Sequence, residues 1–241
     1  MPIVSFSFSF WLIISLLIVS GITSYLAGKL TPLASGIGVV IAVVIYAGAG
    51  LAAICMLAIF FVLGSVATSY KKDYKQKMGL ADAAESRRNL GQVLANAGVP
   101  AILASINIAT GYAQPLLLIM VAASFASAIG DTLSSELGNV YGKNFYNALT
   151  LKKDKRGLNG VISLEGTLFG IAGSILIAFI HAIFYGWSPA LFVITISGIV
   201  GNLSDSLLGA LFERKGYLGN DAVNFLNTAI AAVVALLLVR L

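Results

Sequence analysis

The chain has 241 residues, of which 59% are apolar and only 10% are charged, with a formal net charge of +5. Soluble domains carry about 25% charged residues, so this composition excludes a soluble globular protein and predicts an all-α, polytopic bundle of transmembrane helices. Cys55 is the only cysteine and His181 the only histidine, which excludes an intrachain disulfide and a Cys/His metal site. No nucleic-acid partner is expected.

A transmembrane helix needs about 20 predominantly apolar residues. Eight stretches approach this length, and we treat them as one membrane domain of residues 1–241. They cover about residues 6–26, 33–48, 51–69, 90–108, 113–137, 163–185, 189–212 and 222–239. The sequence Gly48-Ala49-Gly50 allows only a very tight bend, so the second stretch is either a short crossing or a re-entrant segment.

All the basic residues except Arg240 fall in the segments that follow the first, third, fifth and seventh spans. These segments share one side of the membrane if all eight stretches cross it, and short basic loops remain in the cytoplasm. We therefore expect both termini to lie outside, and the basic loops together with any active site to face the cytoplasm.

An internal repeat is indicated by the pattern R-x-L-x-x-V-x-x-x-x-G, which occurs at residues 88–98 and 156–166. Each copy leads into a span, and the next span returns with an acid between small residues, Asp131 or Asp205. The pattern predicts two parallel repeat units, at about 85–145 and 153–215. Transporters and other membrane proteins with such repeats place their sites at the repeat interface.

Three acidic residues lie where the chain is expected to enter or leave the membrane. They are Asp131, Glu136 and Asp205. At that depth a charge costs about 3 kcal/mol on insertion scales, so such groups are usually paired, solvated or functional. Asn202 shares a helical face with Asp205, whereas Asp131 and Glu136 are about 140° apart on an ideal helix. With Glu136 or Glu165, the two aspartates predict a Mg²⁺ site. The alternative is that the acids only balance interfacial lysines.

Basic side chains just before two of the spans predict phosphate binding. They are Arg88 ahead of the fourth span, and Lys153, Lys155 and Arg156 ahead of the sixth. Helix N-termini attract phosphate, and arginine offers a planar fork for its oxygens. The glycine-rich stretch 157–160 would let backbone amides approach an anion. The sequence has no Walker A loop, and the lysines of residues 71–77 have the simpler interpretation of topology determinants.

Three motifs carry a family resemblance. They are G-D-T-L-S-S-E-L-G at residues 130–138, R-G-L-N-G-V-I-S-L-E-G-T at 156–167 and L-S-D-S-L-L-G-A at 203–210. Together they resemble the integral membrane family that contains phytyl-phosphate kinase of plants and cyanobacteria, along with uncharacterised bacterial, archaeal and animal members. The resemblance covers about residues 31–227. It implies a kinase that converts phytyl phosphate, or a similar isoprenoid monophosphate, to the diphosphate, as in tocopherol biosynthesis.

The same resemblance implies site roles for six residues. They are Asp131, Glu136, Asn159, Ser163, Asp205 and Asn224. The family often has a second glycine where this chain has Asn159-Gly160, so the role of Asn159 stays open. Residues 130–143 are also similar to the G-D…G…G-K pattern of CTP-dependent dolichol and phytol kinases, which implies a nucleoside triphosphate, CTP among them, as donor.

These observations predict a membrane lipid kinase in which Asp131 and Asp205 hold Mg²⁺, assisted by Glu136. The residues predicted to bind substrate or phosphate are Arg88, Lys153, Lys155, Arg156, Asn159, Ser163, Asn202 and Asn224. The expected partners are an isoprenoid phosphate lipid, a nucleoside triphosphate and membrane lipids, and a homo-oligomer is compatible with the sequence. A lipid-phosphate cytidylyltransferase and a secondary transporter using the intramembrane aspartates remain as alternatives.

Overall fold

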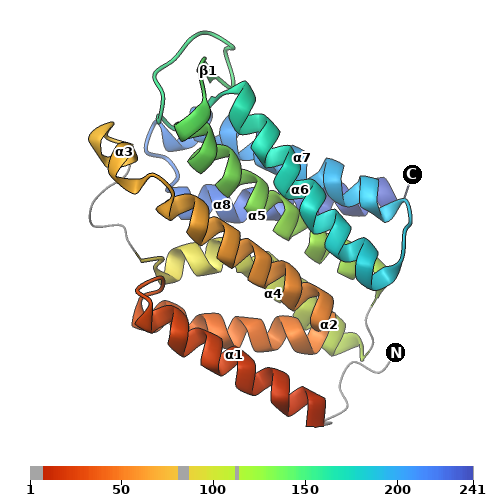
Figure 1. The fold of residues 1–241 in the computed structure, drawn as a ribbon. Helices are drawn as coiled ribbons and strands as arrows, with labels where there is room; N and C mark the ends of the chain where they lie inside the picture. Colours follow the sequence, from red (N-terminus) through yellow and green to blue (C-terminus); the bar gives the residue numbers. More distant parts are fainter. Residues whose placement is uncertain (1–7, 81–86, 112–113, 241) are drawn as a thin grey trace.

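A computed structural model describes residues 8–80, 87–111 and 114–240 of the protein as a helical bundle (Figure 1). The helices are α1 Phe8–Leu26, α2 Pro32–Ser69, α3 Lys72–Lys77, α4 Leu90–Thr110, α5 Pro115–Tyr141, α6 Leu164–Tyr185, α7 Ala190–Leu208 with a π-helical turn η1 Gly209–Glu213, and α8 Asn220–Val239. Seven helices of the described ranges are long and apolar enough to span a membrane, which confirms the all-α, polytopic prediction. Two predicted spans begin at residues 6 and 113, and one predicted repeat unit begins at residue 85. These three residues lie outside the described ranges.

Helix α2 is a hairpin of two limbs. A straight helix of 38 residues would be about 57 Å long. Yet Lys29, just before α2, donates a hydrogen bond from Nζ to Oγ of Ser69 at its far end, at 2.9 Å. The chain reverses at Gly50, whose φ of 75° and ψ of −170° are non-helical and suit a residue without a Cβ. The first limb, Pro32 to Ala49, is about 27 Å long, which is enough for a crossing. The predicted bend is thus present, and the path makes eight passes.

The bundle is built around α5. Every residue of α5 from Met120 to Gly130 is buried, because α2, α4, α6, α7 and α8 all pack against it. Its contact with α6 is especially close: a Cβ added to Gly138 would lie 2.9 Å from Cα of Gly166. Small residues at such positions allow helices to approach at backbone distance in a membrane, where close packing drives association.

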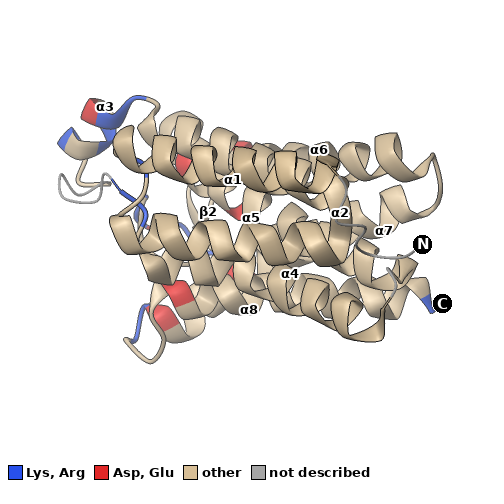
Figure 2. Cartoon of the chain, turned by 90° about the horizontal axis from the view of Figure 1, so that it is seen from below, with Lys and Arg blue, Asp and Glu red and all other residues tan. Residues whose placement is uncertain are grey.

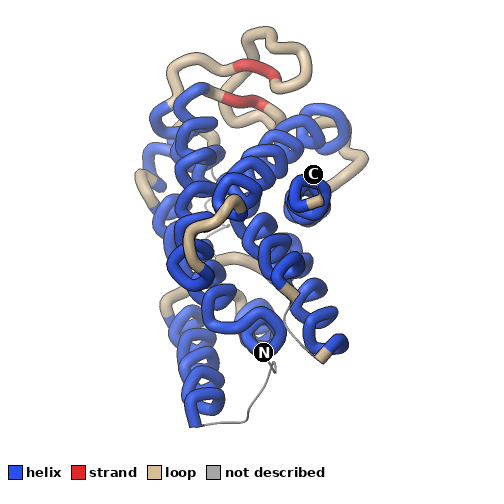
Figure 3. Tube along the Cα trace, turned by 90° about the vertical axis from the view of Figure 1, so that its right-hand side faces the viewer, coloured by secondary structure: helices blue, strands red, loops and turns tan. Residues whose placement is uncertain are grey.

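Charged residues gather at one end of the bundle (Figure 2). Arg240, at the end of α8, marks the opposite end. The charged end also carries α3 and the α5–α6 loop, in which β1 (Tyr146–Asn147) pairs antiparallel with β2 (Val161–Ile162) (Figure 3). This separation agrees with loops that share one side of the membrane. That this side is the cytoplasmic one stays a prediction.

The two copies of the repeat pattern have different local structures. Residues 90–98 lie in α4, whereas residues 158–162 lie in a loop and in β2, and α6 begins only at Leu164. At the level of helices the correspondence is simpler, since α5 and α7 each return with an aspartate. The duplication itself stays a prediction.

Helix α3 is attached to the bundle by a buried lysine. The side chain of Lys75 is only 1% exposed, and its Nζ lies 2.6 Å from Oε2 of Glu136 on α5. The same Nζ donates to the carbonyl oxygens of Ala67 and Thr68 at 3.0 and 2.8 Å. Lysine near a helix C-terminus satisfies carbonyls that lack an intrahelical partner. Lys75 therefore fastens α3 and α5 to the end of α2.

We expect Lys75→Met to lower the free energy of unfolding by about 3 kcal/mol, because it leaves Glu136 unpaired. Glu136→Gln should also destabilise, and the double variant should lose less than the two single losses added together. Denaturant unfolding in detergent micelles measures all three. Exposed Lys77→Met is the control and should be near neutral. Additive single and double effects would show that the pair is not coupled.

Candidate functional site

Asp131 on α5 and Asp205 on α7 face each other near the charged end of the bundle. Their carboxyl groups lie within hydrogen-bonding range, and both side chains are half-buried. Two carboxylates this close repel each other strongly in a medium of low dielectric constant. A proton or a cation between them offsets that repulsion. The pair is therefore the chemical centre of the candidate site.

An amide group fixes the orientation of Asp205, and a further polar pair lies next to Asp131. Asn227 of α8 donates from Nδ2 to Oδ1 of Asp205 at 2.8 Å, while its own Oδ1 accepts a hydrogen bond from Ser127 at 3.0 Å. Beside Asp131, Ser134 donates to Oδ1 of Asn202 at 3.1 Å. Asn227 and Ser127 are fully buried, so the carboxylate of Asp205 is held by a side chain that has little freedom to turn.

A polar cavity of about 240 Å³ opens beside the pair, and we call it the loop cavity. Both acids line it, together with residues 157–163 of the α5–α6 loop. Gly160 has a φ of 73°, and a Cβ there would collide with the backbone of Ala210 in η1. Only glycine lets this loop lie directly on η1. The three sequence motifs, far apart along the chain, all contribute to the wall of this cavity.

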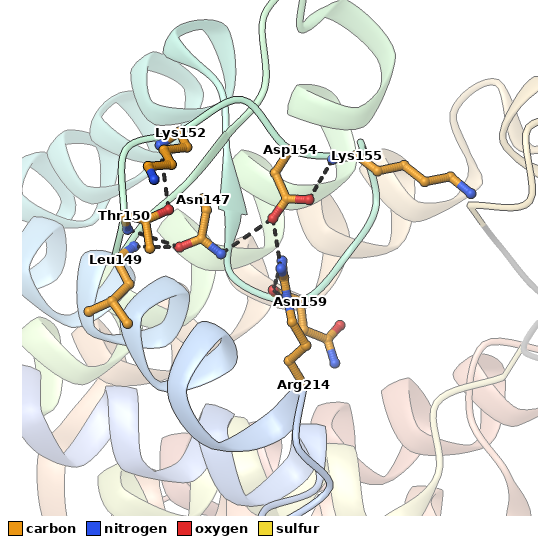
Figure 4. A network of polar contacts seen from close by, with 8 residues as sticks. All are labelled: Asn147, Leu149, Thr150, Lys152, Asp154, Lys155, Asn159 and Arg214. Atoms are coloured by element: carbon orange, nitrogen blue, oxygen red, sulfur yellow. Dashed lines mark hydrogen bonds and ion pairs between the residues drawn. The ribbon is translucent and has the colours of Figure 1, made fainter.

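Arg214, the residue that follows η1, also holds this loop (Figure 4). Its Nη1 lies 2.7 Å from Oδ2 of Asp154, and its Nε and Nη2 donate to the carbonyl oxygen of Asn159 at 3.0 and 2.7 Å. Asp154 also accepts a hydrogen bond from the side chain of Asn147 at 3.3 Å. The hydrogen bond from Arg214, together with one from the backbone N–H of Lys155, holds the pKa of Asp154 below its ordinary value. The stabilisation of the loop by the ion pair between Asp154 and Arg214 is therefore present at neutral pH, and it is lost as the pH falls through the lowered pKa of Asp154.

A second polar cavity, of about 200 Å³, lies on the other side of Asp131, and we call it the arginine cavity. Arg87, Arg88 and Asn224 line it, and Asp131 is shared with the loop cavity. The guanidinium of Arg88 stacks over the ring of Phe60, 5.0 Å from its centroid. Burial lowers its pKa, and no described residue forms a hydrogen bond or an ion pair with its guanidinium. The buried Oδ1 of Asn224 has no hydrogen-bond partner either.

A desolvated cation and an unsatisfied amide oxygen in one cavity indicate a site built for a ligand. A buried polar group without a partner costs about 1–3 kcal/mol, so its presence calls for an explanation. An anion would accept hydrogen bonds from Arg88. If it also carried a hydroxyl or a metal-bound group that donates a hydrogen bond to Oδ1 of Asn224, it would satisfy both side chains. Phosphate has this chemistry, and arginine binds it through paired hydrogen bonds.

A family model described as integral membrane protein DUF92 matches residues 15–232 of the chain. The chain belongs to the DUF92 family. The match confirms the family predicted from the three motifs. No solved structure matches the chain.

Among the relatives of this DUF92 protein is Protein VTE6, chloroplastic, of Arabidopsis thaliana, which is 34% identical over 198 residues. That alignment covers 78% of this chain but only 59% of the plant protein. An uncharacterized membrane protein of Methanocaldococcus jannaschii is 34% identical over 183 residues, which cover 76% of this chain and 74% of its own length. Another, from Synechocystis, is 31% identical over 214 residues, which cover 86% and 81%.

In this DUF92 protein the structure brings most of the predicted site residues to the two cavities. The loop cavity contains Asp131, Asp205, Asn159, Ser163 and Asn202, and the arginine cavity contains Asp131, Glu136, Arg88 and Asn224. Ser163 also caps α6, since its Oγ accepts a hydrogen bond from the backbone N–H of Gly166 at 3.1 Å.

Four predicted residues lie outside the walls of both cavities: Lys153, Lys155, Arg156 and Glu165. Arg156 stacks over the rings of Tyr74 and Phe145, and its Nε and Nη2 have no hydrogen-bond partner. Oε2 of Glu165 accepts a hydrogen bond from the backbone N–H of Lys143 at 3.4 Å. Phosphate binding by the three basic residues and Mg²⁺ binding by Glu165 stay predictions, and the two cavities give them no further support.

The donor set at the acid pair suits Mg²⁺. Across the described ranges, no group of three or more His, Cys, Asp or Glu side chains converges on one point. Glu136 is occupied by Lys75, and Glu213 of η1 is a further carboxylate in the wall of the loop cavity. Asp131 and Asp205 are the two carboxylates that lie within hydrogen-bonding range of each other. Mg²⁺ usually binds one or two protein carboxylates and completes its octahedron with water and substrate phosphates. The pair fits this mode, because the two polar cavities beside it leave room for further ligands of the metal.

Sequence reasoning missed Asn227 and undervalued Lys75. The signal for Asn227 was available: Asn220, Asn224 and Asn227 are spaced i, i+4 and i+7, which places three amides on one face of an apolar helix. Lys75 carries no such signal. It lies among several lysines, and only the fold shows that this one is buried.

We expect Arg214→Gln to loosen residues 154–160 without unfolding the bundle, because the side chain ties this loop to η1. Backbone amides of that segment should exchange with deuterium roughly threefold faster, while the helices stay protected. Hydrogen–deuterium exchange with mass spectrometry measures this. The neighbouring Lys215→Gln is the control. Equal exchange in both variants would show that Arg214 does not hold the loop.

Proposed function

We propose that this protein is a membrane lipid kinase that phosphorylates an isoprenoid monophosphate at the expense of a nucleoside triphosphate. The observation that carries the proposal is the meeting of two polar cavities at Asp131, beside its partner Asp205. One cavity has a glycine-containing loop in its wall and the other a desolvated arginine. Two phosphate-bearing substrates would thus meet at a pair of carboxylates.

In this proposal the two cavities hold different substrates. The donor triphosphate lies in the loop cavity, against the backbone of residues 157–163 and the end of α6 capped by Ser163. The acceptor phosphate lies in the arginine cavity, where Arg88 supplies a cation with two parallel donors and Asn224 an acceptor. An acceptor oxygen bonds to the γ-phosphorus as the bond from that phosphorus to the bridging oxygen breaks, and the nucleoside diphosphate leaves.

The chain's own residues contribute positioning and charge neutralisation. A phosphate oxygen is already ionised at neutral pH, so the reaction requires no strong base. Phosphoryl transfer depends mainly on holding two polyanions in line and offsetting their charge. Asp131 and Asp205 would hold a Mg²⁺ ion, which supplies neutralisation of the phosphate oxygens when bound. Asn227 and Ser127 keep Asp205 turned toward Asp131.

The finer assignments rest on resemblance. The motif likeness to the family of phytyl-phosphate kinase favours phytyl phosphate or a similar isoprenoid phosphate, and with it a tocopherol context. The G-D…G-K likeness over residues 130–143 favours CTP as donor. The charged end, where the cavities lie, would face the cytoplasm.

Two other functions use the same residues. A cytidylyltransferase would take the same substrates and release pyrophosphate. A secondary transporter would use the aspartates as cation sites, and alternating access requires them to be reached from both sides. The gathering of the charged residues at one end favours an enzyme over a transporter (Figure 2).

The proposal is tested on purified, lipid-reconstituted protein with phytyl or geranylgeranyl monophosphate, Mg²⁺ and each labelled nucleoside triphosphate. We expect label from the γ-phosphate to appear in a lipid diphosphate. Nucleotide attached to the lipid, with release of pyrophosphate, would establish the cytidylyltransferase instead. No transfer to any lipid by folded protein would overturn the kinase and leave transport as the leading function.

We expect Asp131→Asn and Asp205→Asn each to lower kcat by at least about 100-fold, because each removes a charge that positions the phosphates. The thermal unfolding midpoint should fall little, since asparagine keeps the shape of the side chain. Exposed Asp73→Asn on α3 is the control and should retain wild-type turnover. Near-normal turnover in either site variant would exclude the acid pair from the reaction.

A further inference from the structure

A third cavity, of about 550 Å³, lies among α1, α2 and α4 and is distinct from the two polar ones. We call it the three-helix cavity. Its volume lies within the range of about 300–1,000 Å³ that is typical of small-molecule sites. Gly21 is the only fully buried residue of α1, which packs mainly on α2 at the edge of the bundle (Figure 1). The cavity is thus bounded on one side by a peripheral helix that faces the bilayer.

The three-helix cavity meets the arginine cavity. Arg88 and Gln92 line both of them, at the start of α4. Cavities that share these two side chains are adjacent, so one elongated molecule lying past Arg88 would place its two ends in the two cavities. The end in the arginine cavity would be beside Asp131, at the candidate reaction centre.

The wall of the three-helix cavity changes from polar to apolar along its length. Its polar residues are Ser20, Thr23, Ser24, Ser35, Gln92 and Arg88. They lie in the last two turns of α1, the first turn of α2 and the start of α4. These helix ends meet, since Leu30 pairs with Arg88 and the N–H of Leu30 donates to the carbonyl oxygen of Ser24. The far part is lined by aliphatic side chains, among them Ile13, Leu17 and Leu51. This gradient fits a ligand with an anionic head and a hydrocarbon tail.

We infer that the three-helix cavity holds the hydrocarbon tail of the acceptor lipid, with its phosphate at Arg88. The inference rests on the proposed function, because the lipid phosphate is the acceptor in that reaction. From Phe61 to Leu51 the cavity follows α2 for about 15 Å at 1.5 Å per residue. Each carbon of an extended zigzag chain advances about 1.25 Å, so this length takes roughly a dozen carbons. Longer tails would leave the cavity past α1 into the bilayer.

Two glycines of α2 make a matched test. Gly38 lines the three-helix cavity, and a Cβ there meets only Cγ1 of Val93, at 3.9 Å. A leucine at position 38 can therefore extend into the cavity without moving the backbone. Gly36 is exposed on the same limb, and a Cβ there meets nothing within 4 Å. Gly36→Leu thus repeats the substitution outside the cavity.

The first experiment measures binding alone, without nucleotide. A geranylgeranyl monophosphate with a diazirine at the end of its tail is cross-linked to the purified protein, and the labelled peptides are mapped. We expect label on α1 and on the second limb of α2, removed by excess unlabelled geranylgeranyl monophosphate. Gly38→Leu should lower the labelling about tenfold, while Gly36→Leu leaves it unchanged. Label on other helices, or equal labelling of both variants, would overturn the inference.

The second experiment measures turnover with monophosphates of increasing prenyl chain length. We expect Gly38→Leu to lower kcat/KM for long chains and to spare the shortest ones, whereas Gly36→Leu behaves as wild type. Specific cross-linking without phosphoryl transfer would support the tail-binding site and contradict the proposed kinase activity. Phosphoryl transfer with the same chain-length profile in both variants would overturn the tail site and leave the kinase standing.

Discussion

The structure is organised by the electrostatic cost of placing Asp131 beside Asp205 inside an apolar bundle. Neither carboxylate can be solvated fully there, and their mutual repulsion adds to the cost. A hydrogen bond from the side-chain amide of Asn227 on α8 replaces water at Asp205, and the Ser134–Asn202 hydrogen bond joins α5 to α7 in the wall of the loop cavity. The negative charge that remains faces two cavities, and in the proposed function a cation and phosphates would be bound there. The candidate site is thus the place where the negative charge of the two acids is not fully balanced by the surrounding helices.

Glu136 and Asp131 show how one helix can carry both a paired acid and an acid that faces open cavities. Glu136 is five residues beyond Asp131 and therefore points to another side of α5, where Lys75 neutralises it. That ion pair also closes the end of α2 and holds α3 in place. A carboxylate already paired with a buried lysine is a weaker ligand for Mg²⁺ than one facing an open cavity. In the proposed site the two aspartates would thus be the stronger metal ligands.

The fold and much of the site could be predicted from the sequence, because both leave local signals. The bundle is predicted by the apolar runs, by the bend at Gly48–Gly50 and by the basic residues that all fall in loops on one side of the membrane. The centre of the candidate site is predicted by the acids within apolar runs. What the sequence could not predict depends on contacts between distant segments. Burial of Lys75 needs α3 to fold back on α2, and the clamp of Arg214 on Asn159 joins loops 55 residues apart. The lysines 153 and 155 look like phosphate ligands in sequence, yet the loop carries them away from both cavities.

The depth of the site also explains why cavities of opposite polarity meet there. Asp205 lies about 12 Å from the end of the α7–η1 segment, at 1.5 Å per residue. A lipid phosphate at Arg88 would then remain near the level of the headgroups, and its tail in the three-helix cavity would remain parallel to the helices. The lipid would not have to leave the membrane to react. Only the nucleotide would have to come from water, which accounts for the loop cavity at the charged end of the bundle.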